Sequence, residues 1–212
     1  MKNTLDRLKI KPSKAAPYWQ TLPKPINQLE NPNYIAEGYE LNTTDFKLQL
    51  DKIKKSNVKF GYLIAFSSKE FADILKQTKE LDLDIQWFSY SGIETRETLE
   101  LAMDSADGII YSYPTYDANG TLYANFQRKY SAKYKSWADI YTVTSYDGVY
   151  LVAKVMEEYG TTAIDIQKGL RSIDQFDGIF GNIKLSNAVG KQCVDRKLMW
   201  KKIENNQYKI AD

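Results

Sequence analysis

The residues best suited to chemistry follow an almost unbroken apolar run, Val58 to Ser67, which reads VKFGYLIAFS. Ser67 and Glu70 have the spacing of a helix capping box, so a helix is predicted to begin directly after this run. The free amide groups at a helix start can bind an anionic group such as a carboxylate. The pattern therefore predicts that a small polar molecule binds near Ser67. The plainer alternative is that Ser67 serves only as a helix cap.

Conventional catalytic groups are scarce in this sequence. The chain has no histidine, which removes Ser-His and Cys-His nucleophiles, HExxH zinc sites and the usual proton shuttle. The single cysteine, Cys193, cannot form an internal disulfide bond. No pair of carboxylates is fixed by its spacing as a general acid and base, and no glycine-rich phosphate loop follows a strand. We therefore predict a protein that is not an enzyme and needs no cofactor or metal.

The composition indicates a folded domain and argues against two classes of partner. Hydrophobic residues make up 43% and charged residues 26% of the 212 residues, which is enough for a packed core. A net charge of +2 is too small to favour nucleic acid as a partner. No apolar stretch approaches the roughly 18 residues that a membrane span requires. The first residues, MKNTLDRLKIKPSK, lack the apolar core of a secretory signal peptide.

Apolar segments alternate with helical patterns in the first half of the regular sequence. Strands are predicted at Tyr34 to Leu41, Val58 to Ser67, Asp84 to Tyr90 and Gly108 to Tyr113. The helices between them are predicted to begin at Thr44 or Asp45, after Ser67, and at Thr95. This alternation indicates an α/β fold with a parallel sheet and right-handed crossovers. The Val58 run suits a strand that is buried on both faces.

Ligands of open α/β sheets bind beyond the carboxyl ends of the strands. The loops predicted there are rich in hydroxyl and aromatic groups and poor in charge: Asn42-Thr43, Phe66-Ser67, Tyr90-Ser91 and Tyr113 to Tyr116. These groups suit the binding of a small polar molecule better than its conversion. The tyrosines, 16 in all, could equally be half-buried core residues with hydrogen-bonded hydroxyl groups.

The sequence pattern changes after Pro114. Helices are predicted from about residue 122 to 134, from Asp139 to Tyr159, and from Ala163 to Ile173. Strand-like segments follow at Gly178 to Leu185, Val194 to Ile203 and Gln207 to Ile210, with a hairpin turn at Asn205-Asn206. Residues 1–33 contain five of the six prolines together with several lysines, which predicts an extended arm or linker.

Several segments, taken in order, resemble a known family. The stretch TTDFKLQLDKIKKSNVKFGYLIAFSSKEFADILKQTKELDL, then WFSYSG and SADGIIYSYP, resembles type I periplasmic binding proteins. These are the substrate-binding subunits of ABC transporters for branched-chain amino acids (leucine, isoleucine and valine). The later stretches FQRKYSAKY, TSYDGVYLVAKVMEEYG and FDGIFGNIKLS are similar to the carboxyl-terminal half of the same family. The resemblance covers about Tyr34 to Asp212.

The resemblance implies two lobes that close on a ligand like a hinge, each a three-layer parallel sheet flanked by helices. Residues 34–113 and 194–212 would form the second-lobe α/β domain, and residues 117–190 the helical part of an incomplete first lobe. The chain would cross between the lobes at Pro114 to Asn119 and near Asn187 to Val194. The opening half of the first lobe, and the strand and helix that begin the second lobe, have no counterpart here. The helix faces left uncovered could mediate self-association or bind another chain.

The resemblance also carries individual ligand positions. Phe66 or Ser67 stands where the family lines its cleft, and Tyr141 where an aromatic residue faces the cleft from the first lobe. Ser91 stands where leucine-type receptors have an acidic residue for the ligand's ammonium group. A buried hydroxyl cannot balance that charge, so an amide, a carboxylate or another neutral polar ligand fits better. The predicted ligand-binding residues are Phe66, Ser67, Tyr90, Ser91, Tyr113, Tyr116 and Tyr141.

Two functions from different classes remain open at this point. The first is the substrate-binding component of an ABC importer, or a fragment of one, which would contact permease subunits and act in the periplasm or outside the cytoplasm. The second is a sensor or protein-interaction domain that kept the fold and lost the ligand. An enzyme built on an α/β sheet is a weaker third reading, because no nucleophile has a base beside it.

Overall fold

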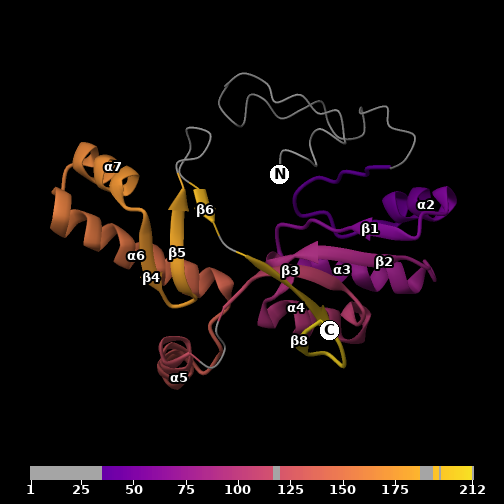
Figure 1. The fold of residues 1–212 in the computed structure, drawn as a ribbon. Helices are drawn as coiled ribbons and strands as arrows, with labels where there is room; N and C mark the ends of the chain where they lie inside the picture. Colours follow the sequence, from indigo (N-terminus) through magenta and orange to yellow (C-terminus); the bar gives the residue numbers. More distant parts are fainter. Residues whose placement is uncertain (1–34, 117–119, 187–192, 196, 212) are drawn as a thin grey trace.

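The computed structural model describes residues 35–116, 120–186, 193–195 and 197–211. Its main sheet has five strands in the order β1-β2-β3-β7-β8 (Figure 1). The strands are β1 (Phe60–Tyr62), β2 (Gln86–Tyr90), β3 (Ile110–Pro114), β7 (Leu198–Ile203) and β8 (Tyr208–Ile210). The first three are parallel, as the alternating pattern predicted, whereas β7 and β8 add antiparallel strands at the far edge.

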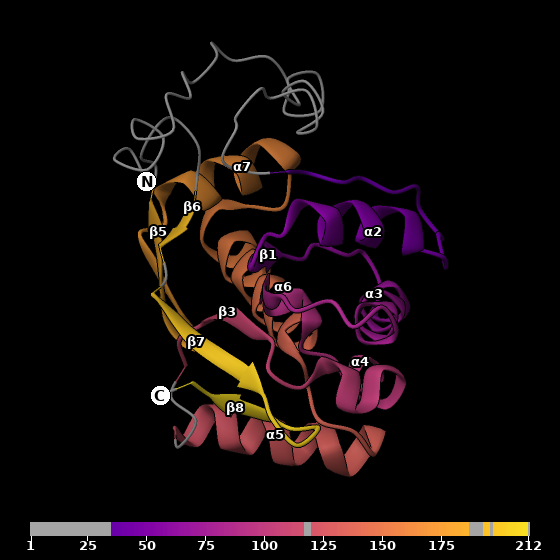
Figure 2. The ribbon, with the colours of Figure 1, turned by 90° about the vertical axis from the view of Figure 1, so that its right-hand side faces the viewer.

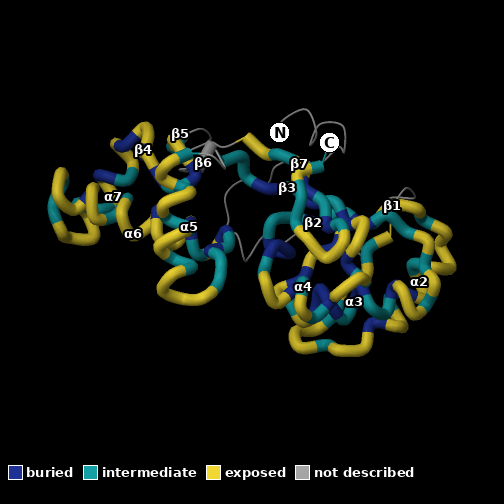
Figure 3. Tube along the Cα trace, turned by 90° about the horizontal axis from the view of Figure 1, so that it is seen from below, coloured by how far each residue is buried: buried dark blue, intermediate teal, exposed yellow. Residues whose placement is uncertain are grey.

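Three helices lie in a row along one face of this sheet (Figures 2 and 3). They are α2 (Lys47–Ser56), α3 (Ser68–Glu80) and α4 (Arg96–Ala102), and the short 3₁₀ turns η2 (Ser91–Ile93) and η3 (Met103–Ala106) flank α4. The core lies between these helices and the sheet, where Phe46, Leu63 and Phe71 are buried. The α/β fold class predicted from the sequence is confirmed.

Helix starts follow the predicted caps at Ser67 and Thr95, but the cap predicted at Thr44 or Asp45 is wrong. The N-cap of α2 is Phe46, which makes no side-chain cap hydrogen bond, and the Gln77 side chain of α3 holds this helix start instead by accepting from the Phe46 amide at 2.7 Å. The Ser67 side chain accepts a hydrogen bond from the Glu70 amide, and the Glu70 side chain accepts one in return, which completes the capping box of α3. Thr95 caps α4 by accepting from the Thr98 amide. Asp139 caps α6 (Ile140–Tyr159) in the same way. The caps at Ser67 and Thr95 fix where the chain that leaves a parallel strand turns into a helix, and Asp139 fixes where the connection from α5 (Thr121–Tyr134) turns into α6.

The second part of the molecule is built on α6, α5 (Thr121–Tyr134) and α7 (Ala163–Ser172). A small antiparallel sheet of β4 (Gln175–Gly178), β5 (Gly181–Ser186) and β6 (Cys193–Asp195) accompanies them (Figure 1). The Asp147 carboxylate of α6 accepts a hydrogen bond of 2.8 Å from the Ile179 amide, which ties the β4–β5 hairpin to this helix. None of the described helices is both long and apolar enough to cross a membrane.

Three further expectations are corrected by the structure. Residues 35–41 form no ladder with any described strand, so the part of the Tyr34 to Leu41 prediction that the structure describes is wrong. Phe60 and Ile64 are 72% and 54% exposed, so the Val58 run is not buried on both faces. The physical reason is shared, because the described residues supply neither a strand beside β1 nor a helix over its second face. In addition, β6 pairs with β5, although residues 194 onwards were predicted to lie with the main sheet.

Other predicted boundaries hold more closely. The hairpin turn between β7 and β8 lies at Asn205 and Asn206, which both adopt positive φ angles (54° and 55°). Asparagine tolerates this left-handed conformation better than most residues do. The predicted arm at residues 1–33 and most of the two predicted crossings between lobes lie outside the described residues.

Candidate functional site

The carboxyl ends of the three parallel strands meet at one edge of the sheet. The register pairs Tyr62 with Phe88 and Tyr90 with Ser112, so the loops after β1, β2 and β3 leave from the same side (Figure 1). Phe66 follows β1 and is 81% exposed, whereas Tyr90 ends β2 and is half-buried. We call this edge, with residues 66–68, 90–95 and 113–116, the carboxyl rim.

A buried carboxylate already holds the loop that begins α3. Glu70 is 5% exposed, and its carboxylate accepts hydrogen bonds from the amides of Phe66 (2.9 Å), Ser67 (3.2 Å) and Asn42 (3.2 Å). The cap predicted for Ser67 is therefore confirmed. Part of the positive end of this helix is neutralised by Glu70, which leaves less of it for an anionic ligand than the sequence suggested.

Tyrosines from both parts of the molecule approach each other beside the carboxyl rim. The Tyr90 hydroxyl donates a hydrogen bond of 2.7 Å to the Ala65 carbonyl, which fixes its ring at the rim. Burial raises the pKa of Tyr90, and smaller contributions come from the hydroxyl groups of Tyr141 and Tyr62. Tyr141 lies on α6 and is 53% exposed. Two predicted residues, Tyr90 and Tyr141, are thus brought within electrostatic reach of each other.

Ser91 is accompanied by hydroxyl groups that the sequence prediction did not include. It begins η2, and its carbonyl accepts a hydrogen bond from the Glu94 amide. The hydroxyls of Ser68 and Thr95 lie 2.8 Å apart, and that of Thr95 lies 2.9 Å from Thr98. This chain of neutral hydroxyl groups links the starts of α3 and α4. Their signal in the sequence is only the N-cap spacing of Thr95 and Thr98, which is common in helices.

The two remaining predicted residues belong to an aromatic cluster at the junction of the two parts. Tyr113 is only 3% exposed, and its ring centroid lies 5.9 Å from Tyr116 and 6.3 Å from Phe180. Tyr116 lies 4.7 Å from Tyr123 of α5. Burial raises the pKa of Tyr113 and Tyr116 above the ordinary tyrosine range. These two rings connect the sheet to α5 and the β4–β5 hairpin rather than lining an open surface.

A buried ion pair lies beneath this cluster and was missed by sequence reasoning. The Lys201 ammonium lies 2.7 Å from the Glu94 carboxylate, and the two side chains are 5% and 8% exposed. The Tyr111 hydroxyl donates a hydrogen bond to the same carboxylate. Lys201 also lies 4.5 Å from the Tyr113 ring centroid, within cation–π range. Glu94 and Lys201 stand 107 positions apart, and no local motif joins them.

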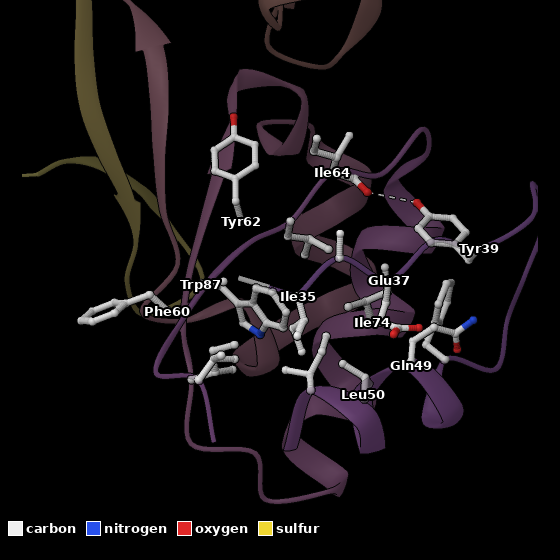
Figure 4. A pocket seen from close by; sticks show the side chains of 17 residues that line it. Ile35, Glu37, Tyr39, Gln49, Leu50, Phe60, Tyr62, Ile64, Ile74 and Trp87 are labelled. Atoms are coloured by element: carbon white, nitrogen blue, oxygen red, sulfur yellow. Dashed lines mark hydrogen bonds between the residues drawn. The ribbon is translucent and has the colours of Figure 1, made fainter. Parts of the chain in front are cut away.

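One cavity of the described residues lies away from the carboxyl rim. A cavity of about 460 Å³ opens beside β1, between this strand, residues 35–39 and α2 (Figure 4). Its walls are mainly apolar side chains. No group of histidine, cysteine and acidic residues suited to holding a metal occurs among the described residues.

The family model described as "Periplasmic binding protein" matches residues 29–198, which is most of the chain. The chain belongs to this family. The leucine-, isoleucine-, valine-, threonine- and alanine-binding protein of Pseudomonas aeruginosa is 25% identical over 126 residues, which are 59% of this chain and 34% of that protein.

Solved periplasmic binding proteins share the fold. A leucine-binding protein of Thermotoga maritima superposes with a TM-score of 0.71 at 18% identity, over 82% of this chain and 49% of that one. A solute-binding protein of an ABC transporter from R. palustris, in complex with benzoate, superposes at 0.66 with 18% identity, over 80% and 47%. The chain thus spans between a third and a half of the length of these periplasmic binding proteins.

Proposed function

We propose that this chain is a substrate-binding component, or part of one, of an ABC importer, and that it binds a small polar solute at the carboxyl rim. The observation that supports this most is the rim itself, where the carboxyl ends of three parallel strands meet at one edge of the sheet. The small effect of Tyr141, from the helical part, on the pKa of Tyr90 agrees with it. A binding protein that closes by a hinge needs side chains from both lobes facing one cleft. In this proposal Phe66, Ser67 and Ser91 belong to the same surface.

The chemistry of the rim favours a neutral or anionic solute over an ordinary amino acid. Ser68, Ser91 and Thr95 offer hydroxyl groups at the rim, which cannot balance an ammonium charge. Glu70 is the carboxylate closest to Ser67 in the chain, and backbone amides already occupy it. Related structures carry names for ligands as different as leucine and benzoate, so the fold itself does not name the solute. An amide or a carboxylic acid is the class that we propose.

The location and partners follow from the same proposal. A component of this kind would act outside the cytoplasm and deliver its solute to permease subunits of the importer. It would carry out no reaction of its own. Tyr113 and Tyr116 would then hold the two parts of the molecule together around the solute, because they lie in the aromatic cluster that joins the two parts.

Calorimetric titration with leucine, benzamide (a neutral amide) and benzoate tests the proposed solute site. We expect heat from the amide or the carboxylate and a weaker response to leucine. Tyr141→Ala should weaken binding by about fivefold, because a stacked aromatic contact is worth about 1 kcal/mol. Tyr134→Ala is the matched control, since this tyrosine of α5 is 54% exposed and Tyr141 is 53% exposed. Equal affinities for the two variants would contradict the proposed site.

A second function is favoured by one observation, the open face of α6. Tyr146, Val149 and Tyr150 are 39%, 68% and 53% exposed on this helix. Exposed apolar patches of this kind often mark protein contacts. The alternative is therefore a sensor or interaction domain that associates through this face. Sedimentation velocity separates the two functions: a monomer that responds to solute supports the first, and a stable oligomer without any solute response supports the second.

A further inference from the structure

The carboxyl rim contains a carboxylate that is already bound to a cation. Glu94 is the only acidic residue among the rim residues, all of which the structure describes. Each of its two oxygens lies 2.7 Å from the Lys201 ammonium, and the side chains of Glu94 and Lys201 are 8% and 5% exposed. The lysine therefore occupies this carboxylate as the ammonium group of a ligand would.

Aromatic rings complete the surroundings of this ammonium. The ring centroids of Tyr113 and Tyr116 lie 4.5 Å and 5.9 Å from the Lys201 Nζ atom, within cation–π range. Lys201 pairs with Tyr111 across β7 and β3, so the two side chains leave the same face of the sheet. The Tyr111 hydroxyl donates a hydrogen bond to the Glu94 carboxylate. A carboxylate beside aromatic faces suits the recognition of an ammonium ion.

The loop that presents Glu94 is held independently of Lys201. The Tyr208 hydroxyl lies 2.8 Å from the Ile93 carbonyl and 2.7 Å from the Thr95 carbonyl. It also accepts a hydrogen bond of 3.1 Å from the Thr95 amide. These contacts fix the backbone on both sides of Glu94, so its carboxylate should keep its place when the lysine side chain is removed.

Stability alone does not account for an ion pair at this depth. Apolar side chains of similar size can often replace a buried pair of charges without loss of stability, because the desolvation of both charges offsets their attraction. This pair lies at the surface that we propose for the solute, where it affects which charge a solute can carry. With Lys201 in place, a second ammonium group would meet a like charge and a carboxylate that is already occupied.

We propose that Lys201 determines the specificity of the carboxyl rim by acting as a built-in ammonium ligand. Its side chain fills the site between Glu94 and the rings of Tyr113 and Tyr116, and so restricts the rim to neutral and anionic solutes. This rests on the proposed function, since it explains the charge of the solute at the same rim. Removal of the lysine side chain should open a site for a primary alkylammonium ion.

Chemical rescue of a truncated lysine tests this site. Lys201→Ala removes three carbon atoms and the ammonium nitrogen, and n-propylammonium supplies the same heavy atoms. The probe is n-propylammonium chloride, added to the full chain during thermal unfolding followed by circular dichroism. We expect saturable stabilisation of the variant, half-complete at roughly 10 mM for so small a ligand. At ten times the half-saturating concentration, the melting temperature should rise by about 3–6 °C.

Three controls separate recognition of the ammonium from the filling of a hole. 1-Propanol has the same length without the charge, and it should raise the melting temperature by less than about a third as much. The double variant Glu94→Gln/Lys201→Ala keeps the hole without the carboxylate. It should respond to n-propylammonium chloride no more than to sodium chloride at the same concentration. The parent chain, in which Lys201 fills the site, should show no saturable response either.

The rescue can be measured even if Lys201→Ala is unfolded without the probe, because n-propylammonium should then restore the helical signal in the far ultraviolet. Failure to stabilise or refold this variant would overturn the proposal. An equal effect of 1-propanol, or an equal response of the parent chain or of the Glu94→Gln double variant, would also overturn it. None of these readouts involves benzoate or benzamide, so the rescue can fail while solute binding at the carboxyl rim is confirmed, and the reverse also holds.

Discussion

At the scale of single residues, Lys201 carries the charge whose removal should destabilise this fold most. Its ammonium is 2.7 Å from Glu94, and both side chains are almost fully buried. Lys201→Met leaves the Glu94 carboxylate buried without its counter-ion, which costs about 3–5 kcal/mol in comparable pairs. Urea denaturation should show this loss of unfolding free energy. Lys209→Met, which breaks an exposed pair with Glu204, should cost less than about 1 kcal/mol.

The double variant Glu94→Gln/Lys201→Met separates two explanations for that loss. Because neither variant side chain is charged, most of the unfolding free energy should return. A double variant as unstable as Lys201→Met alone would show that Lys201 acts through its packing against the Tyr113 ring instead.

Buried tyrosines should make the stability of this protein sensitive to high pH. Burial, and then the negative charge of Glu94, raises the pKa of Tyr111, Tyr113 and Tyr208. The unfolded chain loses these protons above about pH 10 while the folded chain keeps them, so stability is complete below that pH and falls above it. Absorbance of tyrosinate during unfolding measures the effect. Tyr111→Phe should make the fall shallower by about 1.4 kcal/mol per pH unit, and an unchanged slope would contradict the assignment.

Sequence reasoning reached only part of this residue-level picture. Ser67, Tyr90 and Ser91 were predicted because they stand where apolar runs end, and each lies at the carboxyl rim. Glu94 and Lys201 could not be predicted, because a contact between residues 107 positions apart leaves no local pattern. Whether any of these residues contacts a solute stays a prediction.

At the scale of secondary structure, Glu70 is the residue that joins a loop to a helix. Its carboxylate accepts from the amides of Phe66, Ser67 and Asn42. Glu70→Ala leaves these amides without that acceptor and should lower the unfolding free energy by about 2 kcal/mol. Glu97→Ala, an exposed residue in the first turn of α4, should change it by less than about 0.5 kcal/mol. Equal effects in a thermal melt would argue that the Glu70 network adds nothing beyond a surface charge.

Element prediction succeeded where local signals suffice. The helix starts predicted at Ser67, Thr95 and Asp139 and the Asn205-Asn206 turn are properties of short stretches, and the structure confirms them. The cap predicted at Thr44 or Asp45 is wrong, since α2 begins after Phe46. The strand expected at Tyr34 to Leu41 failed because a strand needs a neighbour to pair with, and the described chain provides none beside residues 35–41. The burial of β1 failed for the same reason. An apolar stretch such as Val58 to Ser67 suits burial on both faces, and the described residues do not supply the partners for that burial.

At the scale of the whole molecule, the two parts meet through aromatic rings rather than through a shared sheet. Tyr113 and Tyr116 of the first part contact Tyr123 and Phe180 of the second. Tyr116→Ala should loosen this junction and make the relative orientation of the two parts more variable, because it removes ring contacts on both sides. Small-angle X-ray scattering should then report a larger radius of gyration than for the parent chain. An unchanged radius would show that the crossing segments alone set the orientation.

The measurement that tests the account most directly is a map of amide chemical shifts by NMR during solute titration. Benzamide or benzoate is added to the isotope-labelled chain up to about 10 mM, since a chain that spans about half of its structural relatives should bind weakly. We predict saturable shifts at residues 66–68 and 90–92 and at Tyr141, with the amides around Trp87 unaffected. If the shifts are confined to the cavity beside β1, or if neither compound shifts any amide of the carboxyl rim, the result would contradict a solute site at the ends of the parallel strands.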